Sequence, residues 1–337
     1  MTRIQPLTET HHDGLFGDAP LGTDATSRDE KHRPYAELQR VLDHLEMAGR
    51  PFSRTTVGTS NQGRDIDMIS VGRGDTDILF VGQQHGNESS GSTSLVALLH
   101  YLASGKSKAH LDDVTVHVVP RANPDGAEIE FRGNVDPDAP DPDTDEGIFT
   151  TTYQGRGWDP NRYHFPDWTE SRLYKHHPEQ FPENPVPEAR AVTEAVDRVD
   201  PELFVDIHGQ GEKTTEDGAA VTHSVMWPVL GEKPIPEDGL ALSKKMCVQV
   251  YDHLSRFDRV VSRYPATAAY PGVAHKAYGL QDRGSIIYEV VEPKSVDQYR
   301  TRTRTTLPSL LSLIGTAATG GIHYRDPDRV EEIPHIG

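Results

Sequence analysis

Two segments of the chain place histidine and carboxylate side chains directly after an apolar stretch. In ILFVGQQHGNESSG, the apolar run is followed by His85 and Glu88 and then by the start of a helix near Ser90. In VDIHGQG, His208 follows the apolar run 203–207. The ends of buried strands are where α/β sheets place their ligands. Two histidines and one glutamate can hold a catalytic zinc with one position left for water, although a capping glutamate and a core histidine would leave similar patterns.

Further polar groups lie close to these segments in the chain or interrupt apolar runs. Asp206 precedes His208 by two residues on the same strand face and could orient that imidazole. Glu289 interrupts the apolar run SIIYEVV, where an isolated carboxylate must be paired, protonated or functional. The pair Asn161–Arg162 in DPNRYH is a planar, fork-shaped donor set that suits a carboxylate.

The elements that must position these residues alternate along the chain. Apolar runs bounded by turns predict strands at 66–71, 78–81, 114–119, 203–207 and 286–291. Helical periodicity begins at Tyr35 and recurs near 91–103, 187–198, 240–254 and 296–314. This order predicts an α/β fold with a mixed, largely parallel central sheet and helices on both faces.

Three parts of the chain depart from that pattern. Residues 1–33 predict a disordered tail, and 317–337 are expected to form a C-terminal tail, which leaves one domain at 34–316. The acidic segment 133–160 predicts a long surface loop. Its Asp141, Asp143 and Asp145 alternate, but glycine is missing at the sharp turn and Thr152 stands at the bidentate position of a calcium loop, so a solvated loop is favoured over calcium binding.

Composition bounds the environment and the partners. The net charge is −18, and ten of the 34 basic residues are lysine, a balance that disfavours nucleic acid and anionic lipid and is typical of halophilic proteins. Cys247 is the single cysteine and is expected to be a buried small hydrophobe. The N-terminal residues lack the pattern of a signal peptide, and no apolar run reaches the length of a membrane span. We therefore expect a cytoplasmic monomer.

Taken together, the ordered motifs resemble the zinc metallocarboxypeptidase family typified by carboxypeptidases A and B. The resemblance runs from about residue 35 to about residue 313 and includes the entry helix, GTSNQGRDI, His-x-x-Glu, NPDG, the Asn–Arg pair, the strand-end histidine and the late-strand glutamate. It implies that 34–316 is a zinc carboxypeptidase catalytic domain that hydrolyses the C-terminal peptide bond of peptides through a zinc-activated water.

The resemblance also implies a role for each matching residue. His85, Glu88 and His208 would hold one zinc ion, the two-histidine, one-glutamate set known from carboxypeptidase A. Glu289 would be the general base, and Arg132 would stabilise the oxyanion. The substrate-binding residues that it implies are Asn161 and Arg162 for the terminal carboxylate and Tyr270 as the mobile tyrosine. Tyr264 and Tyr278 compete with Tyr270, and Tyr163 stands where the family usually has a second asparagine.

The pocket for the terminal side chain falls, by the same resemblance, near 273–276, with Ala274 as its floor. A small apolar floor predicts a preference for bulky apolar termini, whereas a slip of one residue would bring His275 or Lys276 inward and favour acidic termini. Two other functions share the motifs: an N-acyl amino acid amidohydrolase of the succinylglutamate desuccinylase or aspartoacylase type, and a non-catalytic peptide-binding descendant. NPDG, the distance to His208 and the position of Arg132 favour the peptidase.

Overall fold

The computed structural model describes residues 33–47, 52–105, 110–139, 150–151, 157–231, 233–265, 270–294 and 296–337. The predicted N-terminal tail lies outside the described residues except for Arg33. The residues on which the calcium hypothesis depends also lie outside them: Asp141, Asp143, Asp145 and Thr152. Within the described ranges, no helix has both the length and the apolar character needed to cross a membrane.

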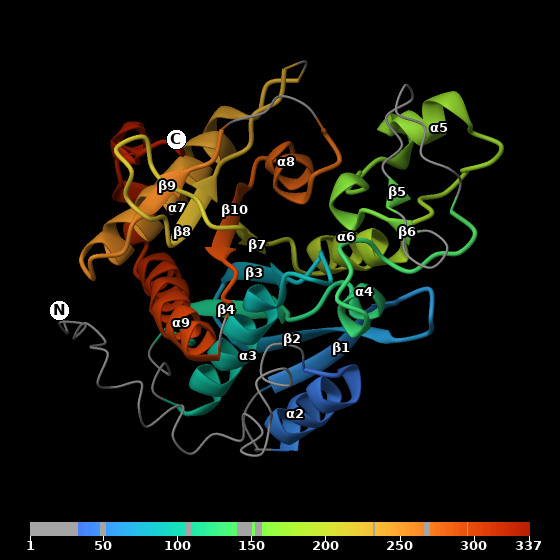
Figure 1. The fold of residues 1–337 in the computed structure, drawn as a ribbon, viewed down its shortest axis with the longest axis horizontal. Coiled ribbons are helices and arrows are strands. Elements are labelled where there is room, and N and C mark those ends of the chain that lie inside the picture. Colours follow the sequence, from blue (N-terminus) through green and yellow to red (C-terminus); the bar gives the residue numbers. More distant parts are fainter. Residues whose placement is uncertain are drawn as a thin grey trace.

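A mixed central sheet organises the molecule (Figure 1). Its strand order is β1-β2-β4-β3-β7-β10-β8-β9. The strands are β1 (Phe52–Thr59), β2 (Asp65–Gly72), β3 (Thr76–Gly82), β4 (Val114–Val119), β7 (Leu203–Gln210), β8 (His223–Met226), β9 (Val261–Arg263) and β10 (Gly284–Val291). The β4–β3, β3–β7, β7–β10 and β8–β9 pairs are parallel, and the β1–β2, β2–β4 and β10–β8 pairs are antiparallel. The predicted fold class is therefore confirmed.

Helices connect the strands and cover the sheet. The α-helices are α2 (Tyr35–Met47), α3 (Ser89–Ala103), α4 (Pro124–Glu128), α5 (Arg172–His176), α6 (Pro187–Val199), α7 (Glu237–Ser255), α8 (Ala274–Gly279) and α9 (Val296–Ala318). Short 3-10 helices are η2 (Pro160–Arg162), η3 (Trp168–Glu170), η4 (Gly321–Tyr324) and η5 (Pro327–Glu332). A separate two-stranded sheet joins β5 (Thr150–Thr151) to β6 (Gly157–Trp158).

Alternation along the buried strands divides the core into two layers. Ile78 and Phe80 of β3 pack in a cluster with α2, α3, α7 and α9, whereas Leu79 and Val81 pack in a second cluster with α6 and α8. Successive strand side chains point to opposite faces, so both faces of β3 are covered and the strand reads as continuously apolar. Figure 1 shows α3 and α9 on the side of the sheet opposite to α6.

The five predicted strands and the predicted helices are all present, but three strands of the central sheet and both strands of the small sheet were not predicted. β1 has the sequence FSRTTVGT at the sheet edge, where all positions except the buried Val57 are exposed or half-buried, so it carries little apolar signal. β8 has four residues and β9 has three, and such short strands leave no readable period in the sequence.

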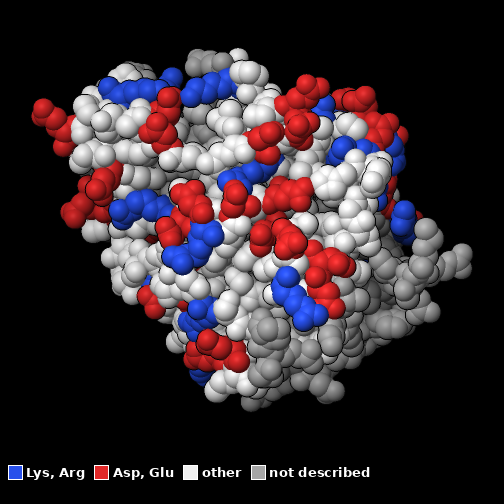
Figure 2. Space-filling view, turned by 180° about the vertical axis from the view of Figure 1, so that it is seen from behind, with Lys and Arg blue, Asp and Glu red and all other residues white. Residues whose placement is uncertain are grey.

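Two segments predicted to be irregular contribute to packing. The segment predicted as a C-terminal tail continues α9 to Ala318 and then forms η4 and η5, which contact α7 and bury Ile322, Val330 and Ile333. In the predicted acidic loop, the described residues Asn134 and Trp158 are buried. Figure 2 shows acidic side chains spread over one face of the molecule with basic groups among them.

A buried carboxylate at the start of α6 ties that helix to the segment after α4. Glu188 is 0% exposed, and its Oε2 accepts a hydrogen bond of 2.7 Å from Asn134 Nδ2, while its Oε1 has no partner among the described residues. Burial raises the pKa of the Glu188 carboxyl group to about 7. The native state therefore keeps a proton on Glu188 at pH values where the unfolded chain has released it.

Glu188 is expected to make the protein less stable as the pH rises from about 4.5 to about 7, because unfolding releases a proton over that interval. Glu188→Gln keeps the oxygen that accepts from Asn134 and cannot ionise. We expect the variant to exceed the wild type by about 3 kcal/mol in free energy of unfolding at pH 8, with the difference becoming small near pH 4.5. Denaturant titrations at several pH values measure this. Glu194→Gln, on the exposed side of the same helix, is the control, and a difference that does not change with pH would contradict the prediction.

Candidate metal centre

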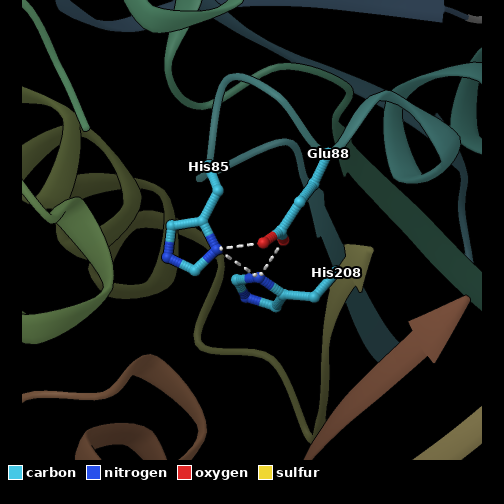
Figure 3. Close-up of side chains that lie close together, drawn as sticks. All are labelled: His85, Glu88 and His208. Atoms are coloured by element: carbon cyan, nitrogen blue, oxygen red, sulfur yellow. Dashed lines mark hydrogen bonds and ion pairs between the residues drawn. The ribbon is translucent and has the colours of Figure 1, made fainter. Parts of the chain in front are cut away.

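Two adjacent parallel strands bring the three predicted metal ligands together. His85 and Glu88 lie in the loop that follows β3, and His208 lies near the end of β7. Gly82 pairs with Ile207, so the two strands end at the same edge of the sheet. In Figure 3 the two imidazole rings and the carboxylate converge on one point.

The distances between these three side chains are short. His85 Nδ1 lies 2.9 Å from Glu88 Oε1, and His208 Nδ1 lies 2.9 Å from Glu88 Oε2. The two Nδ1 atoms are 3.1 Å apart. All three residues are buried, with exposed fractions of 3–7%. Three donor atoms therefore face one another within a space that excludes bulk water.

The backbone around His85 is shaped for this convergence. Gln83 adopts a φ of +54°, a left-handed conformation that is uncommon for a residue other than glycine. A Cβ atom on Gly86 would come within 2.1 Å of the Gly126 backbone, so only glycine allows the loop to pass α4. Asn123 of the NPDG motif caps α4 and donates to the carbonyl oxygens of Gln84 and Gly133. The NPDG motif thus fixes the position of the loop that carries His85 and Glu88.

An outer carboxylate orients each histidine. Asp206 Oδ2 lies 2.8 Å from His208 Nε2, as the spacing on the strand predicted. Asp159 Oδ1 lies 3.0 Å from His85 Nε2, and this partner was not predicted, although it directly precedes the Pro-Asn-Arg segment. A carboxylate that accepts the Nε2 hydrogen leaves Nδ1 of each ring as the metal-binding atom.

The electrostatics follow from these contacts. Burial alone would raise the pKa of Glu88, but the adjacent His85 and His208 hold it well below its usual range. Burial would likewise lower the pKa of His208, yet the charges of Asp206 and Glu88 raise it well above its ordinary value. The donors therefore lie in a field that favours bound positive charge.

Behind Asp206, a buried hydrogen-bond chain extends away from the centre. Asp206 Oδ1 accepts from Gln84 Nε2 at 2.7 Å, and Gln84 Oε1 lies 2.6 Å from His164 Nε2. His164 Nδ1 lies 3.0 Å from the hydroxyl group of Tyr278. Sequence reasoning missed Gln84 and His164, whose only signal was their place beside the QQHGNE and DPNRYH segments.

Glu289 lies next to the metal-ligand residues. It pairs in register with His208 across the β7–β10 ladder, so both side chains leave the same face of the sheet. Its Oε2 is buried and has no hydrogen-bond partner among the described residues. Burial raises the pKa of the Glu289 carboxyl group to about 8. An uncommitted carboxylate beside a metal centre is a candidate for proton transfer.

Arg132 and Arg162 bring positive charge to the same space. Arg132 contacts Glu88 Oε1 at 3.2 Å and Asp159 Oδ2 at 3.1 Å, and its side chain is 39% exposed. Arg162 lies 3.8 Å from the Asp159 carboxylate. Both guanidinium groups therefore border the centre on the side of Asp159.

Asn161 is more enclosed than the sequence suggested. Its Nδ2 donates to Asp206 Oδ2 at 3.2 Å and lies 2.9 Å from His208 Nε2, and its Oδ1 accepts from the Ala274 amide at 2.8 Å. Both ends of this amide are thus engaged by the protein. The geometry makes Asn161 a residue that joins the centre to α8, beside its predicted role in carboxylate binding.

The three candidate tyrosines occupy different environments. Tyr270 is 41% exposed, has a φ of +61°, and its ring lies 5.1 Å from the Arg162 guanidinium carbon. Tyr278 is fully buried and hydrogen-bonded to His164, so it cannot reach a substrate. Tyr264 is half-buried. Its burial raises the pKa of its hydroxyl group, and the negative charge of the nearby Glu289 raises it further. Tyr270 combines exposure with a contact to Arg162.

Comparison with known proteins identifies the family. A family model for zinc carboxypeptidases (Peptidase_M14) matches residues 38–216, just over half of the chain. The chain belongs to the zinc carboxypeptidase family. Human carboxypeptidase Z is 30% identical over 132 residues, which are 34% of this chain and 20% of that protein. The human carboxypeptidase N catalytic chain is 24% identical over 203 residues, 53% of this chain and 42% of that one. The chain thus matches about a fifth of carboxypeptidase Z and less than half of carboxypeptidase N.

Solved structures share the fold of this chain. Bovine thrombin-activatable fibrinolysis inhibitor in complex with a tick carboxypeptidase inhibitor has a TM-score of 0.65 at 14% identity, covering 88% of this chain and all of that one. Carboxypeptidase A from Helicoverpa armigera has a TM-score of 0.62 at 19% identity, covering 92% and 80%. These likenesses support the topology described above.

The donor set of this zinc carboxypeptidase fits a zinc ion. Tetrahedral zinc with bonds of about 2.0–2.1 Å separates its ligand atoms by roughly 3.3 Å, close to the 2.9–3.1 Å between the three donors. Two imidazoles and a carboxylate, with a carboxylate behind each imidazole, are also the chemistry that zinc prefers. The cofactor is therefore zinc, for which His85, Glu88 and His208 are the candidate ligands.

One zinc ion per chain is expected, and His208→Ala should abolish stoichiometric zinc because two donors do not hold the ion tightly. Metal analysis after dialysis against a weak chelator measures this. His323→Ala, at a half-exposed histidine on η4, is the matched control and should keep its zinc. Undiminished zinc in His208→Ala would remove His208 from the site.

Asp206→Asn tests the outer carboxylate separately. The amide can still accept a hydrogen bond but carries no charge, so we expect zinc affinity to fall by about 10–100-fold while the fold is kept. Competition with a chelator of known affinity gives the dissociation constant. Asp252→Asn, which alters an ion cluster with Arg325 and Arg329, should leave that constant unchanged. Equal zinc affinity in Asp206→Asn and the wild type would contradict the orienting role.

Proposed function

We propose that this zinc carboxypeptidase hydrolyses the C-terminal peptide bond of peptides. The observation that carries the proposal is the uncommitted Glu289 carboxylate, which lies beside the metal donors in a space bordered by Arg132 and Arg162. Hydrolysis of an amide needs a base for the water and a cation for the developing oxyanion. A terminal carboxylate needs a second cation, and two arginines border this site.

The roles divide as follows. Bound zinc supplies Lewis-acid chemistry and lowers the pKa of water. Glu289 takes a proton from the attacking water and returns it to the nitrogen of the leaving amino acid. Arg132, on the solvent side of Glu88, stabilises the negative charge on the scissile carbonyl oxygen.

A second group of residues binds the end of the peptide. Arg162 pairs with the terminal carboxylate, and Asn161 supports it from the backbone turn of η2 while joining that turn to α8. Tyr270, stacked on the Arg162 guanidinium, closes over the carboxylate. Its left-handed φ is the kind of strained backbone that clusters at ligand clamps.

A panel of substrates tests the reaction class. Zinc-loaded protein is mixed with blocked dipeptides, and in parallel with N-succinylglutamate and N-acetylaspartate, and the free amino acid is quantified with and without a chelator. Release from the blocked dipeptides alone, lost on chelation, is the expected result. Release from the N-acyl amino acids alone would establish the amidohydrolase, and release from neither would favour a peptide-binding protein without activity.

Glu289→Gln is expected to keep zinc and substrate binding but to lose about 10²–10⁴-fold in kcat, because a positioned general base commonly contributes that much. Steady-state kinetics on a cleaved dipeptide, together with metal analysis, measure both properties. Glu237→Gln, an exposed carboxylate on α7, is the matched control. If Glu289→Gln kept more than about a tenth of wild-type kcat, another residue would have to be the base.

A further inference from the structure

The first turn of α8 forms a wall next to the metal centre. α8 packs on β7 and β10, the strands that carry His208 and Glu289. The Ala274 amide donates to Asn161 Oδ1, and Asn161 in turn contacts His208. A Cβ atom on Gly272 would come within 2.0 Å of the Arg162 carbonyl oxygen, so the segment before α8 lies against η2. The side chains of this turn are therefore held close to the arginine proposed to bind the terminal carboxylate.

His275 is a buried polar group without a visible structural role. It is 1% exposed, and neither of its ring nitrogens has a hydrogen-bond partner among the described residues. Leaving such a group unsatisfied is costly, and native proteins do so rarely. Burial and the adjacent Lys276 lower the pKa of His275 to about 3, while Asp206, His208 and Arg162 also act on it. The ring thus lies within the electrostatic range of the metal centre with its hydrogen-bonding capacity unused.

Lys276 places a cation in the same wall. It is 1% exposed, although lysine is almost never fully buried in proteins. Burial and the charge of Arg162 lower its pKa to about 8. The chain carries a net charge of −18, and acidic groups are spread over the face shown in Figure 2, yet Arg162, His275 and Lys276 lie close enough to act on one another. Lys276 thus adds a second cation beside Arg162, next to the neutral ring of His275.

The side chain of Ala274 points elsewhere. It is 0% exposed and belongs to the hydrophobic cluster on the face of the sheet that α6 covers, together with Phe204 and Tyr278. Positions 274 and 278 lie one turn apart on one helix face, so both side chains pack in this cluster. Ala274 therefore does not serve as the floor of the pocket for the terminal side chain, and His275 and Lys276 are the remaining candidates in this turn.

We propose that His275 and Lys276 select substrates whose C-terminal residue has an acidic side chain, aspartate or glutamate. The inference rests on the carboxypeptidase function proposed above. The terminal carboxylate pairs with Arg162, and the side-chain carboxylate accepts hydrogen bonds from the Lys276 ammonium group and from a ring N–H of His275. Arginine or lysine termini are rejected by like charge, and apolar termini leave the buried ring nitrogens of His275 without a partner.

The test uses zinc-loaded protein and blocked dipeptides that are identical except for terminal Glu, Gln, Leu or Arg. We expect kcat/KM for the Glu substrate to exceed those for Gln and Leu by at least about tenfold, because hydrogen bonds to charged groups commonly change affinity by about ten- to a hundredfold. Lys276→Met should reduce kcat/KM for Glu by about ten- to a hundredfold and leave that for Leu within a few fold. His275→Leu should act in the same direction. Lys245→Met, which removes a charge on α7, is the control.

Binding is measured in parallel so that the two proposals fail separately. Calorimetry on zinc-loaded Glu289→Gln gives the dissociation constants of the same four dipeptides without turnover, and thermal unfolding of each variant shows that it is folded. Cleavage and binding that favour Leu, or a Glu preference unchanged in folded Lys276→Met and His275→Leu, would overturn the acidic specificity while leaving the peptidase intact. Binding in the order Glu, Gln, Leu, Arg without any cleavage would refute the peptidase reaction but support the acidic site. Neither cleavage nor binding would refute both.

Discussion

Buried negative charge at the carboxyl edge of the sheet governs much of this structure. Four carboxylates meet there within hydrogen-bonding or register distance of the two histidines: Glu88, Asp159, Asp206 and Glu289. Two guanidinium groups, those of Arg132 and Arg162, border them. If all four acids are ionised, the arginines balance half of their charge, and a divalent cation balances the rest. Since an unpaired buried charge is expensive, the donor set and the arginines are arranged as one unit around a metal.

That unit needs a rigid surround, and the family motifs outside the ligands supply it. Asn123 ties the loop after β3 to the segment at Gly133, and Asp125 accepts from Ser60, Gln62 and Arg64 of the GTSNQGRD segment. These two motifs therefore act as structural clamps. Asn123 and Asp125 are buried and hydrogen-bonded, which holds the segments around the loop of His85 and Glu88 in place.

The comparisons with solved structures concern the fold that surrounds the metal centre. Structures with 14–19% identity to this chain share its topology. The charged groups at the strand ends have specific partners and distances. Variation within the fold is then expected in the walls around the centre, and α8, with its buried His275 and Lys276, is such a wall.

Local sequence determined the α/β class, the buried strands and the three ligands, because each leaves a local mark. Continuous apolar runs mark strands covered on both faces, and His85, Glu88 and His208 stand where such runs end. Glu289 was visible because a carboxylate in an apolar strand has few structural reasons to be there. The short strands β8 and β9 left no mark, since three or four residues carry no period.

Tertiary structure alone decided which distant groups touch. Asp159 reaches His85 across 74 residues, and His164 reaches Gln84 across 80, pairings that no local pattern encodes. The direction of α8 was likewise open, because a shift of one residue in a loop turns a helix by about 100° and changes which of its side chains pack against the sheet. Packing of Ala274 and Tyr278 against the sheet set that rotation. Residue types at strand ends could therefore be recognised in the sequence. Contacts between distant residues could not, because they depend on how the helices and strands pack.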